Sequence, residues 1–219
     1  VPDNEFEALL SYLERRGPDR QDFVNFKFEN LAVKLGHTRL SILDLNETGN
    51  QPMTSSSGRF TLVYNGEIYN HRELRKDLEK SHSLIWRGTS DTETLLALFE
   101  RYQDVSRVLG SVEGMFSFAL LDRKKRKIIL ARDRSGEKPL YISCSKDSLS
   151  FASDLGPLKK MPGFNSSLDL NSVDKYLRHN YIPNPSSIYK NSFKLPMASY
   201  IDINLDLFIF QPYENFQEL

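Results

Sequence analysis

Apolar positions recur at helical spacing in four parts of the chain. Leucine and phenylalanine follow an i, i+3, i+4, i+7 pattern near the start, which predicts an amphipathic helix over 4–15. Two further helices are predicted after Asn70 and after Ser90, because each of these residues is followed three positions later by a glutamate, as in a capping box. A last helix is predicted around Val173, Tyr176 and Leu177.

Runs of β-branched and aromatic residues predict strands between these helices, at 31–35, 60–64, 115–121, 128–132, 140–144, 149–153 and 199–203. Polar turns, including the basic run 124–127, separate the strands between 115 and 153, so we expect an antiparallel meander there. Asn65-Gly66 directly follows the strand 60–64 and is typical of a hairpin turn. Helices and strands do not alternate regularly, which favours an α+β fold with antiparallel sheets.

Charge and composition narrow the function classes. The chain has 29 basic and 29 acidic residues, so the formal net charge is zero, which argues against a nucleic-acid or anionic-membrane binder. A single cysteine, Cys144, excludes a disulfide framework and favours a cytoplasmic location. The apolar runs are too short to cross a bilayer. We therefore expect no nucleic-acid and no membrane partner.

Several common chemistries lack their motifs in this segment. The four histidines show no metal-ligand spacing, and the sequence contains no GxSxG nucleophile elbow, no phosphate-binding loop and no dinucleotide-binding glycine pattern. The sequence therefore predicts neither a metal site nor a cofactor site in these residues.

Polar residues at the ends of predicted elements suggest a different site. Arg39 could hold a carboxylate with two charged hydrogen bonds, and Asp91, at a helix start, could accept from an ammonium group. The Asn65 amide beside the Gly66 N–H offers two donors to one oxyanion. Each residue also has a simpler interpretation, as a hairpin turn, a first-turn helix charge or a surface ion pair. From the pattern alone, both interpretations stay open.

These residues lie in motifs by which the chain closely resembles the glutaminase domain of the asparagine synthetase family, a class II glutamine amidotransferase. The matching stretches follow one another in family order, at 16–19, 36–44, 51–53, 64–70, 90–93, 113–116, 131–134 and 136–141. The resemblance implies an N-terminal-nucleophile hydrolase fold, a four-layer α-β-β-α sandwich of two antiparallel sheets. It also implies hydrolysis of glutamine to glutamate and ammonia.

The resemblance assigns roles to individual residues. Asn65 and Gly66 correspond to the catalytic oxyanion hole. The remaining matches correspond to glutamine-binding positions, namely Arg39, Leu40, Ser41, Ile42, Leu43, Glu67, Gly88 and Asp91. Small departures from the family pattern occur at Arg15, where a histidine is usual, and at Ser135, where a phenylalanine is frequent.

The main departure is the nucleophile, which in the family is an N-terminal cysteine with its own α-amino group as base. The chain opens with Val1, so we expect the first strand and this cysteine to be missing and the chain to be inactive alone. Cys144 lies in a predicted strand and has no free α-amine, so it is no substitute.

The resemblance also divides the chain and implies partners. We expect a glutaminase domain over 1–203 and, over 204–219, the entry into an absent synthetase domain that uses ATP and Mg to amidate aspartate or a related carboxylate. Glutamine and that C-terminal domain are the expected partners, and a homodimer is one arrangement open to the family. The alternative is a catalytically dead glutaminase-like domain that serves as a structural or interaction module, as in β-lactam-synthetase-like proteins.

Overall fold

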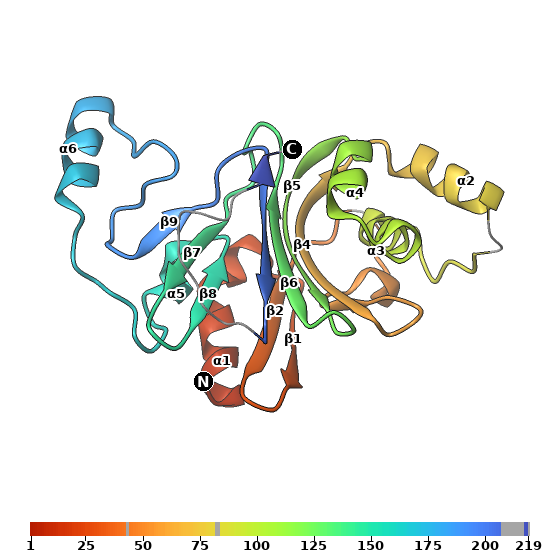
Figure 1. Ribbon diagram of the computed structural model, residues 1–219, viewed down its shortest axis with the longest axis horizontal. Coiled ribbons are helices and arrows are strands. Elements are labelled where there is room, and N and C mark those ends of the chain that lie inside the picture. Colours follow the sequence, from red (N-terminus) through yellow and green to blue (C-terminus); the bar gives the residue numbers. More distant parts are fainter. Residues whose placement is uncertain (43, 82–83, 207–216, 219) are drawn as a thin grey trace.

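Four layers form the molecule, in the order helices, sheet, sheets, helices (Figure 1). The computed structural model describes residues 1–42, 44–81, 84–206 and 217–218. The first of the two inner layers is an antiparallel six-stranded sheet in the order β11-β10-β6-β5-β4-β3. Its strands are β3 (Met53–Thr54), β4 (Phe60–Ile68), β5 (Gly114–Asp122), β6 (Lys127–Arg132), β10 (Ser199–Asn204) and β11 (Gln217–Glu218).

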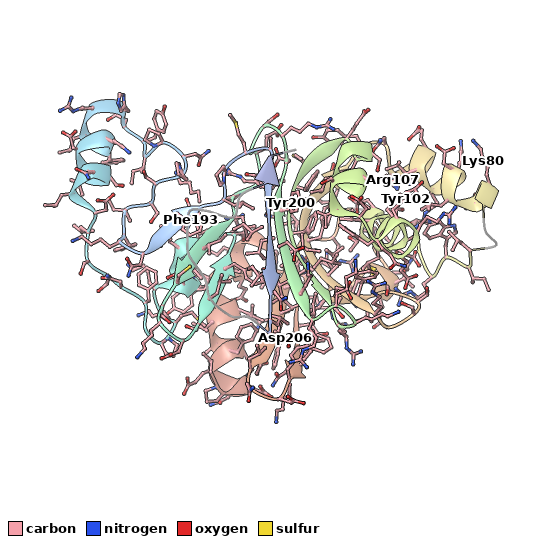
Figure 2. The ribbon with its side chains drawn as sticks, viewed as in Figure 1. Lys80, Tyr102, Arg107, Phe193, Tyr200 and Asp206 are labelled. Carbon is pink, nitrogen blue, oxygen red and sulfur yellow. The ribbon has the colours of Figure 1, made fainter. Side chains whose placement is uncertain are left out.

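Three helices cover one face of this sheet (Figure 1). They are α2 (His71–Ser81), α3 (Asp91–Tyr102) and α4 (Val105–Ser111). Leucine and phenylalanine side chains of the helices and of β4 and β5 form a buried cluster, in which the rings of Phe99 and Phe118 meet edge to face. On the rim of this layer, the Arg107 guanidinium lies 4.0 Å from the Tyr102 ring (Figure 2).

Two separate antiparallel sheets make up the second β layer. One pairs β1 (Arg20–Lys27) with β2 (Ala32–Arg39), and the other has the order β8-β7-β9. The strands of the latter are β7 (Tyr141–Cys144), β8 (Leu149–Ala152) and β9 (Ser192–Lys194). Both sheets bury apolar side chains, among them Leu35, Ile142 and Phe193, against the other face of the six-stranded sheet.

Helices on the outer side complete the sandwich. They are α1 (Asp3–Leu10), the 3-10 helix η1 (Ser11–Arg16) and α5 (Leu155–Leu158). Helix α1 packs on β1 and β2, and α5 packs on β8. A further helix, α6 (Leu170–His179), stands away from the sheets at the end of the molecule opposite α2 (Figure 1). A short 3-10 helix, η2 (Glu47–Gly49), lies in the loop after β2.

The α+β class and the helices predicted after Asn70, after Ser90 and near Tyr176 are confirmed. The helix predicted over 4–15 is confirmed only in part, because its α-helical turns end at Leu10 and continue as η1. The strands predicted at 31–35, 115–121, 128–132, 149–153 and 199–203 are also present, with shifted ends.

The hairpin predicted at Asn65-Gly66 is wrong. Both residues lie inside β4, opposite Ser117 and Phe116 of β5. The glycine serves close approach instead of a turn, because a Cβ at Gly66 would collide with the main chain of Met115 and Phe116.

The single meander predicted over 115–153 is also wrong, because β6 and β7 belong to different layers. Two charged side chains organise the crossover between them. The Asp133 carboxylate accepts hydrogen bonds from the main-chain N–H groups of Phe116, Ser135, Glu137 and Lys138, at 3.0–3.2 Å. Arg132 donates to the carbonyl oxygens of Lys138 and Leu195. Hydropathy alone does not reveal such a change of layer.

Candidate functional site

A cavity of about 580 Å³ lies between the two β layers, at the end of β2 and the middle of β4. Most of the predicted site residues line it, namely Arg39, Leu40, Ile42, Asn65, Gly66, Glu67 and Asp91. Ser41 and Gly88 do not line it, and Leu43 falls outside the described residues. Residues far apart in the sequence therefore meet around one space.

The oxyanion-hole candidates come from the middle of a strand. Asn65 and Gly66 belong to β4. This strand pairs with β5 from Phe60 to Ile68, before and after the two residues, so their positions are rigid. Within the described part of the chain, the Asn65 side-chain amide has no hydrogen-bond partner. It is therefore available to donate to a group in the cavity.

Asp91 is a buried carboxylate at the N-terminus of α3. One of its oxygens accepts from the Tyr64 hydroxyl (2.8 Å) and the Ile68 N–H (2.9 Å), and the other accepts from the Thr92 N–H (2.8 Å). These three donors fix the orientation of the carboxylate, which retains lone pairs for a further donor. Burial and the neighbouring Asp91 charge raise the pKa of the Tyr64 hydroxyl well above its ordinary value, so it stays a donor.

Arg39 holds a loop as well as facing the cavity. Its guanidinium donates to the carbonyl oxygens of Asn46 (2.9 Å) and Asp44 and to the Asn50 side chain (2.7 Å). Gly49 packs against the same group, where a Cβ would collide with it. The sequence predicted a cation at this position, but the attachment of the loop 44–50 to that cation is visible only in the structure.

The remaining predicted positions have supporting contacts. The Ser41 N–H donates to the Asp19 carboxylate (2.6 Å), which ties the start of the Arg39 loop to the turn before β1. Gly88 lies against Asp44 and Thr48, where a side chain would collide with both. The side chains of Leu40 and Ile42 are exposed at the mouth of the cavity.

His37 and Gln51 also line the cavity, and the sequence reasoning gave them no role. Gln51 binds both the N–H and the carbonyl oxygen of Tyr64, at 2.6 and 3.1 Å. His37 Nε2 donates to the same carbonyl oxygen (3.2 Å), while its Nδ1 is buried without a partner among the described residues. Burial, and secondarily the charge of Arg39, lowers the pKa of His37 to about 4. Both residues lie in the motifs 36–44 and 51–53, which was the available signal.

Two strand edges face this cavity. Within the described residues, β2 pairs with β1 alone and β8 pairs with β7 alone, so each leaves one edge unpaired. Residues 148–153, which include all of β8, and six of the eight residues of β2 line the cavity between those edges. Unpaired main-chain groups in such a place can accept a further strand.

Cys144 lies at the end of β7 and does not line the cavity. Burial raises the pKa of its thiol to about 12, so it is not a reactive thiolate at neutral pH. The described residues contain no group of three or more histidine, cysteine, aspartate or glutamate side chains arranged to hold a metal ion. None of the helices in the described ranges combines the length and apolarity needed to cross a membrane.

Comparison with known proteins identifies the kind of domain. Residues 2–214 match the family model of a glutamine amidotransferase domain. The chain is 34% identical over 218 residues to a putative glutamine-hydrolysing asparagine synthetase 2 of Methanocaldococcus jannaschii, an alignment that covers 92% of this chain and 41% of the relative. It is 32% identical to the glutamine-hydrolysing asparagine synthetase 1 of Bacillus subtilis, covering 91% of this chain and 30% of that relative.

A solved structure has the same fold. Glutamine phosphoribosylpyrophosphate amidotransferase from B. subtilis superposes with a TM-score of 0.66 at 16% identity, over 99% of this chain and 46% of that one. The expected N-terminal-nucleophile hydrolase architecture is thereby confirmed. The second β layer differs from the single sheet that the family resemblance implied, since β1-β2 and β8-β7-β9 are separate in the described residues.

Proposed function

The chain belongs to the class II glutamine amidotransferase family, and from this premise we propose that it forms the glutamine-hydrolysing site of an asparagine-synthetase-like protein. One observation carries the proposal. Arg39, Asn65-Gly66 and Asp91, three sets of groups that match the charged ends and the amide of glutamine, line the same cavity. Their arrangement accounts for both binding and chemistry.

The two charged ends of glutamine bind to groups of opposite sign. Arg39 takes the α-carboxylate, and Asp91 takes the α-ammonium through the lone pairs that its three protein donors leave free. The Leu40 and Ile42 region covers the mouth of the site, and Glu67 lies beside it on β4. When both charged ends are bound in this way, the side-chain amide of glutamine extends towards Asn65 and Gly66.

The family's nucleophile is a cysteine, and the described residues that line the cavity include none. We propose that polypeptide outside these 219 residues supplies it, as an N-terminal cysteine on a strand between the free edges of β2 and β8. Its thiolate forms a C–S bond with the amide carbon, and Asn65 and Gly66 donate to the resulting oxyanion. The C–N bond then breaks, ammonia leaves with the proton held by the cysteine amine, and water hydrolyses the thioester to glutamate.

The chain spans less than half the length of the curated relatives it matches. We propose that the ammonia is consumed by another part of the natural protein. We propose that this part uses ATP and Mg²⁺ to amidate aspartate or a related carboxylate. Glutamine and that part of the protein are the proposed partners.

The test uses the natural polypeptide that contains these residues. We expect it to release glutamate from glutamine and to be labelled once, at its N-terminal cysteine, by the glutamine analogue 6-diazo-5-oxo-L-norleucine, as read by intact mass and peptide mapping. A protein that neither hydrolyses glutamine nor takes the label is instead a glutaminase-like domain without activity, and the proposal fails.

Replacement of Asn65 tests the oxyanion hole directly. Asn65→Ala removes one donor, so we expect kcat for glutamine hydrolysis to fall by about 10²–10³-fold with a small change in KM. Asn25→Ala is the matched control, because Asn25 is exposed on β1 and its side chain donates to exposed Asp3. A rise in KM with unchanged kcat would contradict the assignment.

A further inference from the structure

The segment 87–90 leads directly into α3, which begins with Asp91. Three consecutive main-chain N–H groups of this segment donate to carboxylates. Glu93 accepts from Arg87 (2.8 Å) and from Gly88 (3.1 Å). Asp44, in the loop held by Arg39, accepts from Thr89 (2.8 Å).

Arg75 of α2 holds the carbonyl groups of the same segment. Its guanidinium donates to the carbonyl oxygens of Gly88 (2.7 Å) and Ser90 (3.2 Å) and to the Glu93 carboxylate (3.2 Å). It also lies 3.9 Å from the ring of Trp86. The side chains of Arg75 and Glu93 are only 15% and 10% exposed, so little water competes for these bonds.

The segment lies outside the helices and strands, so side-chain bonds hold it in place: those of Glu93, Asp44 and Arg75, and one from the Arg87 side chain to the Thr54 carbonyl oxygen. Glu93 shapes the turn that delivers Asp91, and Arg75 joins that turn to the neighbouring helix α2 (Figure 1). The capping box supplies only part of this arrangement. Ser90 caps the Glu93 N–H, but the Glu93 carboxylate reaches past Ser90 to Arg87 and Gly88.

We propose that Arg75 and Glu93 are positioning residues, which set the place of Asp91 and thereby the recognition of the substrate's α-ammonium group. This inference rests on the proposed function. Neither residue lines the cavity, so their effect passes through the 87–90 segment. The groups proposed to bind the α-carboxylate and the amide lie on β2 and β4, whose places are set by pairing with β1 and β5, and the bonds of Arg75 and Glu93 do not reach those strands.

We therefore expect loss of Arg75 or Glu93 to weaken binding of the α-ammonium group selectively. L-Glutamate and glutarate differ only in this group, so comparing their affinities measures its contribution to binding. In the natural polypeptide we expect L-glutamate to bind more tightly than glutarate. Arg75→Gln and Glu93→Gln should each reduce that preference about tenfold or more, the scale of one hydrogen bond to a charged group, with little change in glutarate affinity.

Arg59→Gln is the matched control. Arg59 forms a similarly buried pair with Asp122 (2.6 Å; 13% and 5% exposed) and lies over the Phe60 ring at 4.6 Å, at the far end of β4. We expect it to cost similar stability without changing the preference. Arg75→Lys keeps the charge with fewer bonds, and it serves as the second variant if Arg75→Gln does not fold.

The experiment is isothermal titration calorimetry with both ligands, together with glutamine hydrolysis by the unaltered protein. Equal losses for L-glutamate and glutarate, or an equal change in Arg59→Gln, overturn the positioning role; hydrolysis by the unaltered protein then leaves the proposed function standing. If the unaltered protein neither hydrolyses glutamine nor binds L-glutamate, the proposed function fails, and the positioning role fails with it.

Discussion

At the end of β2, the Arg39 guanidinium group has two roles. Arg39 lines the cavity, and it also donates to main-chain oxygens of Asn46 and Asp44. Those bonds stabilise the loop 44–50, in which Thr48 lies beside Gly88. Replacing Arg39 by a neutral residue should therefore remove the proposed partner of the glutamine α-carboxylate and also weaken the attachment of the loop.

The first residue-scale prediction concerns this group. In the natural polypeptide, Arg39→Ala should raise KM for glutamine about 100-fold, because a charged contact with the α-carboxylate is lost. Ammonia-dependent product formation should persist, since ammonia bypasses the pocket. Steady-state kinetics with each nitrogen donor measures this, with Arg20→Ala, an exposed strand arginine paired with Asp22, as control. Equal loss with both donors would remove Arg39 from glutamine binding.

His37 makes stability depend on pH. Its pKa is about 4 in the folded chain and 6.5 ordinarily, because protonation would place a charge on the buried Nδ1. The unfolded chain therefore binds a proton between these values while the folded chain does not. The resulting stability is complete above pH 6.5 and is lost as the pH falls towards 4, by about 3 kcal/mol at most.

Urea unfolding at pH 7.5, 6, 5 and 4 measures this effect. His37→Gln keeps a donor for the Tyr64 carbonyl but does not titrate, so the difference between the two proteins isolates His37. We expect the unaltered chain to lose more stability than His37→Gln between pH 6.5 and 4. Parallel curves would show that His37 is readily protonated in the folded state.

At the scale of elements, we expect replacing a glycine by alanine to change stability in opposite directions in strand β4 and in helix α4. Gly66→Ala should destabilise the β4–β5 pair, because the added methyl meets the main chain of Met115 and Phe116. Gly110→Ala should stabilise α4 by about 0.5–1 kcal/mol, because a Cβ there meets nothing within 4 Å. Thermal or urea unfolding compares the two variants. Similar changes of the same sign would contradict the close approach at Gly66.

At the scale of the whole molecule, stability depends on the contact between the two β layers. Leu130 of β6 is fully buried in the cluster that joins the six-stranded sheet to β2, β7 and β9. Leu130→Ala should lower the free energy of unfolding by about 2–5 kcal/mol. Leu170→Ala, which truncates a side chain 75% exposed on α6, should change it by less than about 0.5 kcal/mol. A small effect of Leu130→Ala would show that the layers are only loosely packed.

Local patterns by themselves determined most of the elements and the family motifs. The i, i+3, i+4 spacing predicted the helices, and the serine at position 90 predicted the start of α3, because these signals act within one or two turns of chain. The motifs around Arg39, Asn65 and Asp91 identified the candidate site through resemblance. Their substrate roles stay predictions.

Only the tertiary structure decided which partners these residues have. Asn65-Gly66 reads as a turn until β5 is seen alongside it, because the close approach comes from residues some fifty positions away. The same is true of the layer change after Arg132 and of the Arg75–Glu93 contacts with the segment before Asp91. Hydrogen bonds of buried charged groups depend on distance in space, and distance along the chain does not encode it.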